Sequence, residues 1–197
     1  LANFVVIAIE KAHMRERLVE QERFEADLRV AREIQESILP GSLPTGEYWE
    51  FSARNVPARA VAGDFFDAIP LPNNRTCVVL GDVCGKGVAA ALYMARVLGY
   101  YRVVAQVRET AGEIMAFVND LLAAKWSERA FVTATLCVFD NTTGRISFCS
   151  AGHPVPYLLK EPLGKVMPVE VNHGLPLGIE SGMPYESSEF ERSEERR

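Results

Sequence analysis

The first 39 residues place apolar and charged positions in the pattern of one long α-helix. The stretch holds neither Gly nor Pro, is rich in Glu and Arg, and is closed by Pro40-Gly41. Its apolar residues recur mostly three and four apart, with an irregularity around Gln21, which gives a narrow stripe of the coiled-coil kind. The stripe consists of Ile7, Met14, Leu18, Phe24, Leu28, Ala31, Ile34 and Ile38. Because one helix cannot bury such a stripe by itself, we predict a parallel dimeric linker from an upstream sensor; the alternative is a surface helix packed on its own domain.

From Pro40 onward the apolar positions fall into short runs separated by turn residues, which is typical of strands. The predicted strands cover 47–56, 65–71, 75–83, 131–140, 145–152, 154–160 and 165–171, and the predicted helices cover 88–107 and 112–126. Pro72-Asn73-Asn74 and the segment DNTTG at 140–144 supply turns, and a Gly/Pro-rich loop occupies 173–182. Strands, then two helices, then further strands predict an α+β sandwich with helices packed on largely antiparallel sheets.

Composition and charge narrow the classes of function. Hydrophobic residues make up 48% and charged residues 24% of the 197 positions, as in a soluble globular protein. A formal net charge of −5 gives no electrostatic reason to expect a nucleic-acid partner. The four cysteines lie far apart without a CxxC pair, which favours free thiols in a reducing cytoplasm. The apolar start LANFVVIAI is too short to span a bilayer, so we expect no membrane insertion; because the chain begins at Leu, we also expect a longer parent protein.

Three carboxylates stand where apolar runs end. Asp64 and Asp67 flank Phe65-Phe66, and Asp82 follows the run CVVLG and precedes a Gly-rich turn. A carboxylate at the end of a buried strand is costly unless a partner such as a divalent cation pairs with it, although a single Asp also serves as a turn residue. Without a cluster of His or Cys, the pattern favours Mg²⁺ or Mn²⁺ over zinc. Because strand positions i and i+3 face opposite ways, we expect one of Asp64 and Asp67 to be a ligand and the other a turn or supporting residue.

Three further motifs could indicate nucleotide binding, acid or metal-ligand chemistry, or nucleophilic catalysis. The segment GDVCGKG at 81–87 is not a P-loop, because three residues rather than four separate its first two glycines and a Gly follows the Lys. His153, in SAGHP, is either a general acid or metal ligand or a turn residue ordered by its Gly and Pro neighbours, and we favour the turn. Ser150 has no His/Asp pattern that indicates a triad, so nucleophilic catalysis is not expected.

Six segments, taken in order, resemble a known family. They are AREIQESILP at 31–40, ARAVAGDFFD at 58–67, GDVCGKGVAAALYMA at 81–95, FVTATLCVFD at 131–140, SAGHPVPYLL at 150–159 and GLPLGIE at 174–180. Together they resemble the bacterial branch of the metal-dependent serine/threonine phosphatases (type 2C, or PPM), which includes the sporulation and general-stress phosphatases. The most specific combination is GDVCGKG followed by the Ala-rich helix and then the SAGHP hairpin.

The resemblance implies a fold, a site and a reaction. The fold would be an αββα four-layer sandwich, in which two largely antiparallel sheets flanked by helices hold two Mn²⁺ or Mg²⁺ ions. Asp64 and Asp82 would be the catalytic metal carboxylates, with Asp82 bridging the ions and the Val83 carbonyl contributing. A metal-activated water would hydrolyse phosphoserine or phosphothreonine on a regulatory protein, of the anti-sigma-factor-antagonist type, without a phospho-enzyme. Supporting or turn positions are assigned to Asp67, Gly81, Gly85, Lys86 and Gly87.

The same resemblance implies two regions, a helical linker at 1–39 and a phosphatase domain at 40–197. The linker would join an upstream sensor as a homodimer, and its rearrangement would shift the helix after Asp82 and so complete or dismantle the metal site. The family continues past GLPLGIE to a strand ending in Thr-Asp-Gly that supplies a further metal carboxylate, whereas no Asp follows Asp140 here. We therefore expect a C-terminally incomplete domain. The alternative function is a non-catalytic dimeric signalling or docking module of the same fold.

Overall fold

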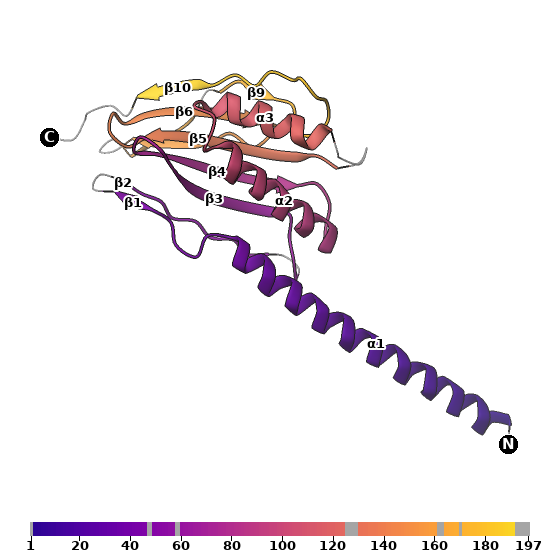
Figure 1. Cartoon of the computed structure of the whole chain (residues 1–197). Coiled ribbons are helices and arrows are strands. Elements are labelled where there is room, and N and C mark those ends of the chain that lie inside the picture. The colour runs from indigo at the N-terminus through magenta and orange to yellow at the C-terminus, as the bar shows by residue number, and fades with distance from the viewer. Residues whose placement is uncertain are drawn as a thin grey trace.

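One long helix forms the N-terminal part of the chain. The computed structural model describes residues 2–46, 49–57, 60–124, 130–160, 164–169 and 171–191. Helix α1 (Ala2–Ile38) runs without interruption and projects away from the rest of the molecule (Figure 1). It ends just before Pro40, because proline disfavours a helical conformation in the preceding residue and lacks the N–H that a helix interior needs. The prediction of a single long helix over residues 1–39 is confirmed.

The body of the protein is built on one six-stranded sheet. Its main path follows the order β10-β6-β5-β4-β3, in which every neighbouring pair is antiparallel, and the short β9 pairs with β6 in parallel. The strands are β3 (Asp64–Leu71), β4 (Arg75–Val83), β5 (Val132–Asp140), β6 (Arg145–Ala151), β9 (His173–Gly174) and β10 (Ser188–Glu191). Asn73 and Asn74 turn the chain between β3 and β4 with φ values of 60° and 54°, a conformation that Asn adopts more readily than most residues.

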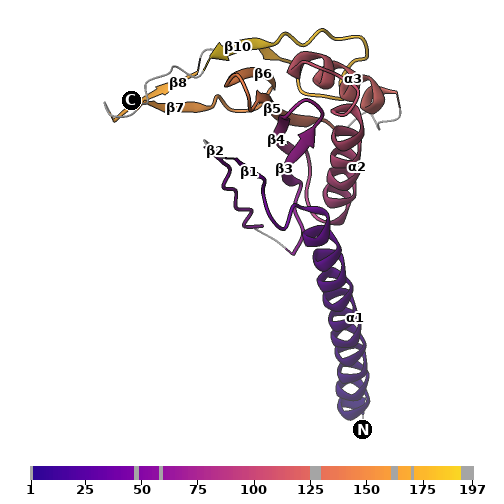
Figure 2. The same ribbon diagram turned by 60° about the vertical axis from the view of Figure 1, so that its left-hand side comes forward.

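Two helices, α2 (Val88–Val104) and α3 (Ala111–Ala123), cover one face of this sheet (Figure 2). Alternate strand residues point toward them, as the period of two requires. The core between the sheet and the helices contains Phe65, Val79, Val83, Ala134, Leu136, Met94, Leu98, Tyr101, Ile114 and Val118, all almost fully buried. The hydroxyl of Tyr101 donates to the Met115 sulfur at 3.1 Å, which satisfies its only polar group inside this core.

On the opposite face of the sheet, the described residues form no covering helix. The small ribbon formed by β1 (Thr45–Gly46) and β2 (Trp49–Glu50) lies on that side, and β7 (Tyr157–Lys160) pairs with β8 (Lys165–Pro168) in a second ribbon (Figure 2). The mixed α+β architecture, with helices on a largely antiparallel sheet, is confirmed. Of the predicted four layers, the described residues form one full sheet and the helical layer on it, together with the two ribbons.

The largest differences from the predicted elements lie at residues 47–56 and at β10. The strand predicted over 47–56 shrinks to β2, and residues 47 and 48 lie outside the described part of the chain. Residues 51–57 run beside β3 without a ladder: the Asn55 side chain donates to the Asp64 carbonyl oxygen at 3.2 Å, and Pro57 has no N–H to offer. Strand β10 was not predicted, because its polar sequence SEFE gives no run of apolar residues and it is ordered by pairing with β6.

The four cysteines are free, as predicted. Burial raises the pKa of both Cys137 and Cys149 to about 12, so these thiols stay protonated and act as small apolar side chains. In the part of the chain that the structure describes, no helix is both long enough and apolar enough to span a lipid bilayer.

Candidate metal centre

Asp64 and Asp82 come together at one end of the hairpin formed by β3 and β4. Asp64 is the first residue of β3, Asp82 is the next to last of β4, and the two are direct cross-strand partners. Partners of this kind place their side chains on the same face of the sheet, with Cβ atoms about 4.5–5.5 Å apart. Both are exposed, on the face away from α2 and α3. The sequence placed Asp82 near the end of the strand predicted over 75–83 and Asp64 just before the strand predicted over 65–71; the structure includes both in strands and places them side by side.

The proximity of the two carboxylates affects their charge. The pKa of Asp82 is raised above its ordinary value, first because partial burial removes hydration and second because the charge of Asp64 repels a second charge; His153 acts in the opposite direction. Two adjacent carboxylates that resist ionising together form a site that a divalent cation would stabilise. The geometry therefore fits the Mn²⁺ or Mg²⁺ that the sequence predicts.

The repulsion gives a testable stability difference. In chelator-treated protein at pH 7, Asp64→Asn should raise the melting temperature by about 1–3 °C, since a like-charge pair costs roughly 0.2–1 kcal/mol and 1 kcal/mol shifts the melting temperature of a chain of this size by about 2–4 °C. Because the folded-state pKa of Asp82 is raised, the folded protein loses stability as the pH rises through that pKa. The gain from Asp64→Asn should therefore shrink as the pH falls through the raised pKa of Asp82, because the repulsion exists only while Asp82 is charged. Differential scanning calorimetry from pH 4 to pH 8 measures the difference in melting temperature between Asp64→Asn and the parent. Asp27→Asn, on exposed α1, is the control. A gain in melting temperature that is independent of pH would contradict the repulsion between Asp64 and Asp82.

Glycines allow the backbone around the carboxylates to pack closely. A Cβ atom on Gly63 would lie 2.5 Å from the Val83 carbonyl oxygen and 3.0 Å from Oδ1 of Asp82. A Cβ atom on Gly81 would lie 2.5 Å from the Phe65 ring and 2.7 Å from the Thr133 carbonyl oxygen. Any larger residue at these two positions would push the strand ends apart. The Val83 carbonyl, a predicted ligand, thus lies against Gly63, at the same end of the hairpin as both carboxylates.

The turn after Asp82 leads directly into α2. Gly85 and Gly87 have φ values of 116° and 71°, which residues with side chains rarely adopt, and Lys86 between them is exposed. The donor set at this end of the hairpin is two carboxylates and one carbonyl, all hard oxygen atoms. Within the described ranges, no three His, Cys, Asp or Glu side chains gather in a group that would hold a metal. The described residues therefore offer two of the carboxylates that a metal site of this kind needs.

Asp67 belongs to the other face of the sheet. It is buried, and its Oδ2 atom pairs with Nε of Arg102 on α2 at 2.6 Å. The same guanidinium donates from a terminal nitrogen to the carbonyl oxygen of Ile38, at the end of α1, at 2.7 Å. Arg102 thus joins β3, α2 and α1, and Asp67 lies on the side of β3 opposite to Asp64.

A second link joins α1 to the carboxylate pair. The buried side-chain amide of Gln35 donates to the Ala62 carbonyl oxygen at 2.6 Å and accepts from the Ala62 N–H at 3.1 Å. Ala62 is two residues before Asp64, so the last turns of α1 hold the segment that leads into the site.

His153 is brought to the carboxylate pair by the strand register. Thr133 on β5 is the cross-strand partner of Asp82, and its Oγ1 atom shares a hydrogen bond of 3.0 Å with Nδ1 of His153. Burial lowers the pKa of His153, and the negative charges of Asp82 and Asp64 partly oppose that effect. Sequence analysis favoured a turn residue here, because a short motif shows neither the register of β4 with β5 nor the bond to Thr133.

Comparisons with known proteins show the fold and the family of the chain. The SiaA PP2C domain of Pseudomonas aeruginosa superposes with a TM-score of 0.68 and 20% identity, over 87% of this chain and 68% of that one, so the fold is that of a PP2C phosphatase domain. The model of the Stage II sporulation protein E (SpoIIE) family matches residues 72–197, more than half of the chain and inclusive of GDVCGKG. This chain belongs to the SpoIIE family, a bacterial PPM phosphatase family of the sporulation and stress branch, as the sequence motifs predicted.

Two curated relatives extend the comparison. Protein IcfG of Synechocystis sp. is 31% identical over 160 residues, which cover 68% of this chain and 25% of that protein. The phosphoserine phosphatase RsbU of Bacillus subtilis is 22% identical over 165 residues, which cover 84% of this chain and 49% of that protein. The chain therefore spans between a quarter and a half of the length of these relatives.

Proposed function

We propose that the protein is a metal-dependent serine/threonine protein phosphatase that acts in signal transduction on a phosphorylated regulatory protein. The single observation that carries the proposal is the direct cross-strand pairing of Asp64 and Asp82 on the helix-free face of the sheet. Membership of the SpoIIE family and the likeness to a phosphoserine phosphatase support the reaction. The resemblance to the general-stress phosphatases favours an anti-sigma-factor antagonist as the substrate.

The residues of the site have distinct tasks in this proposal. Asp64, Asp82 and the Val83 carbonyl would hold Mn²⁺ or Mg²⁺, two ions by the family resemblance, and such ions activate water and neutralise the charge of phosphoryl oxygens. Asp82 is well placed to keep its position, because β4 is paired on both sides, with β3 and with β5. His153, fixed by Thr133 near both carboxylates, is available to donate a hydrogen bond at the edge of the site.

The reaction can be tested directly on the full-length protein. Release of phosphate from a phosphoserine peptide and of p-nitrophenol from p-nitrophenyl phosphate should require Mn²⁺ or Mg²⁺, and a chelator should abolish both. Hydrolysis that persists after chelation would exclude the proposed chemistry. A folded full-length protein that binds Mn²⁺ but hydrolyses neither substrate would favour the non-catalytic module instead.

We further propose that α1 is a linker through which two copies associate. In a single copy, five large apolar side chains of the predicted stripe remain exposed: Ile7, Met14, Leu18, Phe24 and Ile34. Val19 and Val30, outside the stripe, are exposed as well. A second α1 is a suitable cover for such a stripe. The contacts of Gln35 with Ala62 and of Arg102 with Ile38 support a role for this helix in adjusting the carboxylate pair.

Leu28 offers a test of the linker. Leu28→Glu should weaken association, because a carboxylate would be buried in the seam between two helices, and it should change phosphatase output without altering any site residue. Sedimentation velocity and the rate of p-nitrophenyl phosphate hydrolysis, both measured on the full-length protein, report the two effects. His13→Glu, an exposed position outside the stripe, is the matched control. Unaltered oligomeric state and unaltered activity in Leu28→Glu would refute the linker proposal.

A further inference from the structure

A pocket of about 260 Å³ opens beside Asp64. Its walls come from the irregular segment after β2 and from the ends of β3 and β4. The lining residues are Arg54, Asn55, Val56, Asp64, Phe66 and Leu80, with Phe65 behind them. The pocket thus combines one cation, one of the two paired carboxylates and an apolar wall.

The guanidinium of Arg54 is not neutralised within this pocket. Arg54 and Asp64 line the same cavity, yet Arg54 forms no ion pair with any residue that the structure describes. This distinguishes it from Arg102, which is engaged by Asp67, and from Arg32, which is engaged by Glu36. The planar donors of Arg54 therefore remain available to an anion that enters the pocket.

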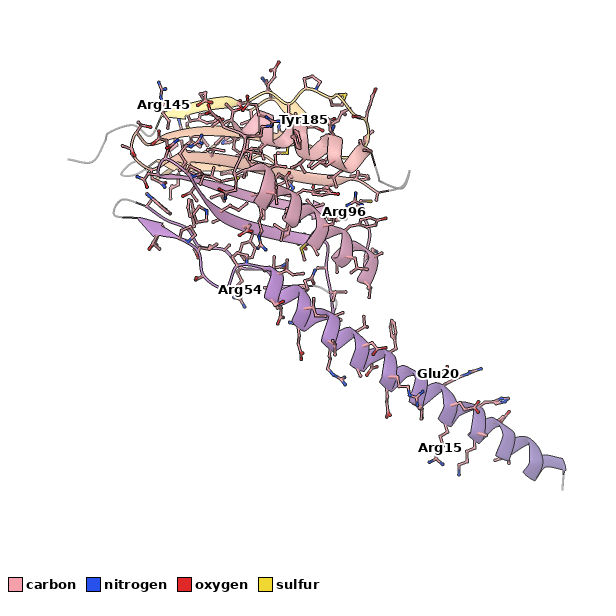
Figure 3. The ribbon with its side chains drawn as sticks, in the orientation of Figure 1. Arg15, Glu20, Arg54, Arg96, Arg145 and Tyr185 are labelled. Carbon is pink, nitrogen blue, oxygen red and sulfur yellow. The ribbon has the colours of Figure 1, made fainter. Side chains whose placement is uncertain are left out.

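The neighbouring residue fixes the location of Arg54. The side-chain amide of Asn55 donates to the backbone carbonyl oxygen of Asp64 at 3.2 Å, which ties this segment to the first residue of β3. Figure 3 shows Arg54 close to the point where α1 meets the body, whereas Arg15 lies far along the projecting part of α1. The segment that carries Arg54 is thus tied to the first residue of β3 by a contact that leaves the Arg54 side chain free of that task.

We infer that Arg54 binds the phosphoryl oxygens of the substrate, which enters the site through this pocket; the inference rests on the proposed phosphatase function. A phosphoryl dianion approaching two carboxylates on a chain of net charge −5 meets repulsion that a free cation at the rim would offset. Arginine suits this task because its fork of N–H donors matches two phosphoryl oxygens at once. Val56, Phe66 and Leu80 form the apolar wall against which the carbon part of the phosphorylated side chain would rest.

The test compares Arg54→Gln and Arg54→Lys with the parent full-length protein in saturating Mn²⁺. Arg54→Gln should raise both KM for p-nitrophenyl phosphate and the inhibition constant of inorganic phosphate by about 10-fold or more, the loss typical of a hydrogen bond to a charged group. Arg54→Lys, which keeps the charge but loses the fork, should fall in between. Affinity for Mn²⁺, measured by calorimetry, should not change. Arg15→Gln is the matched control, because it removes the same charge from exposed α1.

Three results would overturn the inference. The first is an Arg54→Gln protein whose KM and phosphate inhibition both stay within about two-fold of the parent. The second is a fall in Mn²⁺ affinity that accounts for the loss of phosphate affinity. If the parent hydrolyses nothing, the phosphatase proposal fails separately, and calorimetric binding of inorganic phosphate then decides: loss of binding in Arg54→Gln supports the role of Arg54, whereas equal binding in both proteins, or none in the parent, overturns it.

Discussion

Asp82→Asn is expected to abolish metal-dependent hydrolysis while leaving the fold intact. Replacing a group that only orients a metal ligand lowers metal affinity or activity by about 10–100-fold. Asp82 is a proposed direct ligand, so Asp82→Asn should lower kcat/KM for p-nitrophenyl phosphate by more than about 100-fold. The fold should persist, because the carboxylate is exposed and its pKa is already raised by burial and by Asp64. The melting temperature of the metal-free variant should thus equal or exceed that of the parent.

The decisive measurement combines activity with metal binding. Mn²⁺ should raise the melting temperature of the parent and not that of Asp82→Asn, because a ligand stabilises only the state that binds it. Asp27→Asn makes the same chemical change on exposed α1 and should behave as the parent does. A variant that keeps activity within about 10-fold of the parent and keeps its stabilisation by Mn²⁺ would remove Asp82 from the site.

Arg102→Met is expected to lower the stability of the protein strongly. It would leave the carboxylate of Asp67, whose side chain is only 6% exposed, buried without its cationic partner and, among the described residues, with only the Ala68 N–H donating to it, and it would also release the carbonyl of Ile38. Removing one member of a buried pair costs about 3–5 kcal/mol. We expect a loss of about 3 kcal/mol in the free energy of unfolding, the lower end of this range, because the Arg102 side chain is itself 42% exposed.

Urea unfolding at pH 7 measures this loss, and two further proteins identify its origin. The double variant Asp67→Leu/Arg102→Met should recover most of the loss, because it removes the buried charge together with its partner. Arg32→Met breaks an ion pair on α1 whose side chains are 49% and 57% exposed, and an exposed pair of this kind contributes at most about 0.5 kcal/mol. If Arg102→Met and Arg32→Met lower the free energy of unfolding equally, the ion pair of Asp67 with Arg102 stabilises the protein no more than an exposed pair does.

Local patterns in the sequence were sufficient for the elements of the fold. The absence of Gly and Pro before Pro40 predicted α1, and the turn residues at 72–74 and 140–144 marked the two hairpins that form the centre of the sheet. The period of two also predicted that Asp64 and Asp67 face opposite ways, as they do. In each case the relevant physics acts between residues close in sequence, so it can be recognised without knowing the fold. Strand β10 was missed because its order comes from pairing with β6, far away along the chain.

The sequence by itself determined the family and nominated Asp64 and Asp82 as a carboxylate pair, since chain chemistry and motif order are properties of the sequence. Only the tertiary structure decided which groups surround that pair. The register of β4 with β5 places Thr133 beside Asp82 and so brings in His153, and the segment after β2 brings in Arg54. Gln35 and Arg102 tie α1 to the same region. Register and packing depend on contacts between distant residues, and a periodic pattern specifies the face on which a side chain lies but not the neighbour that it meets.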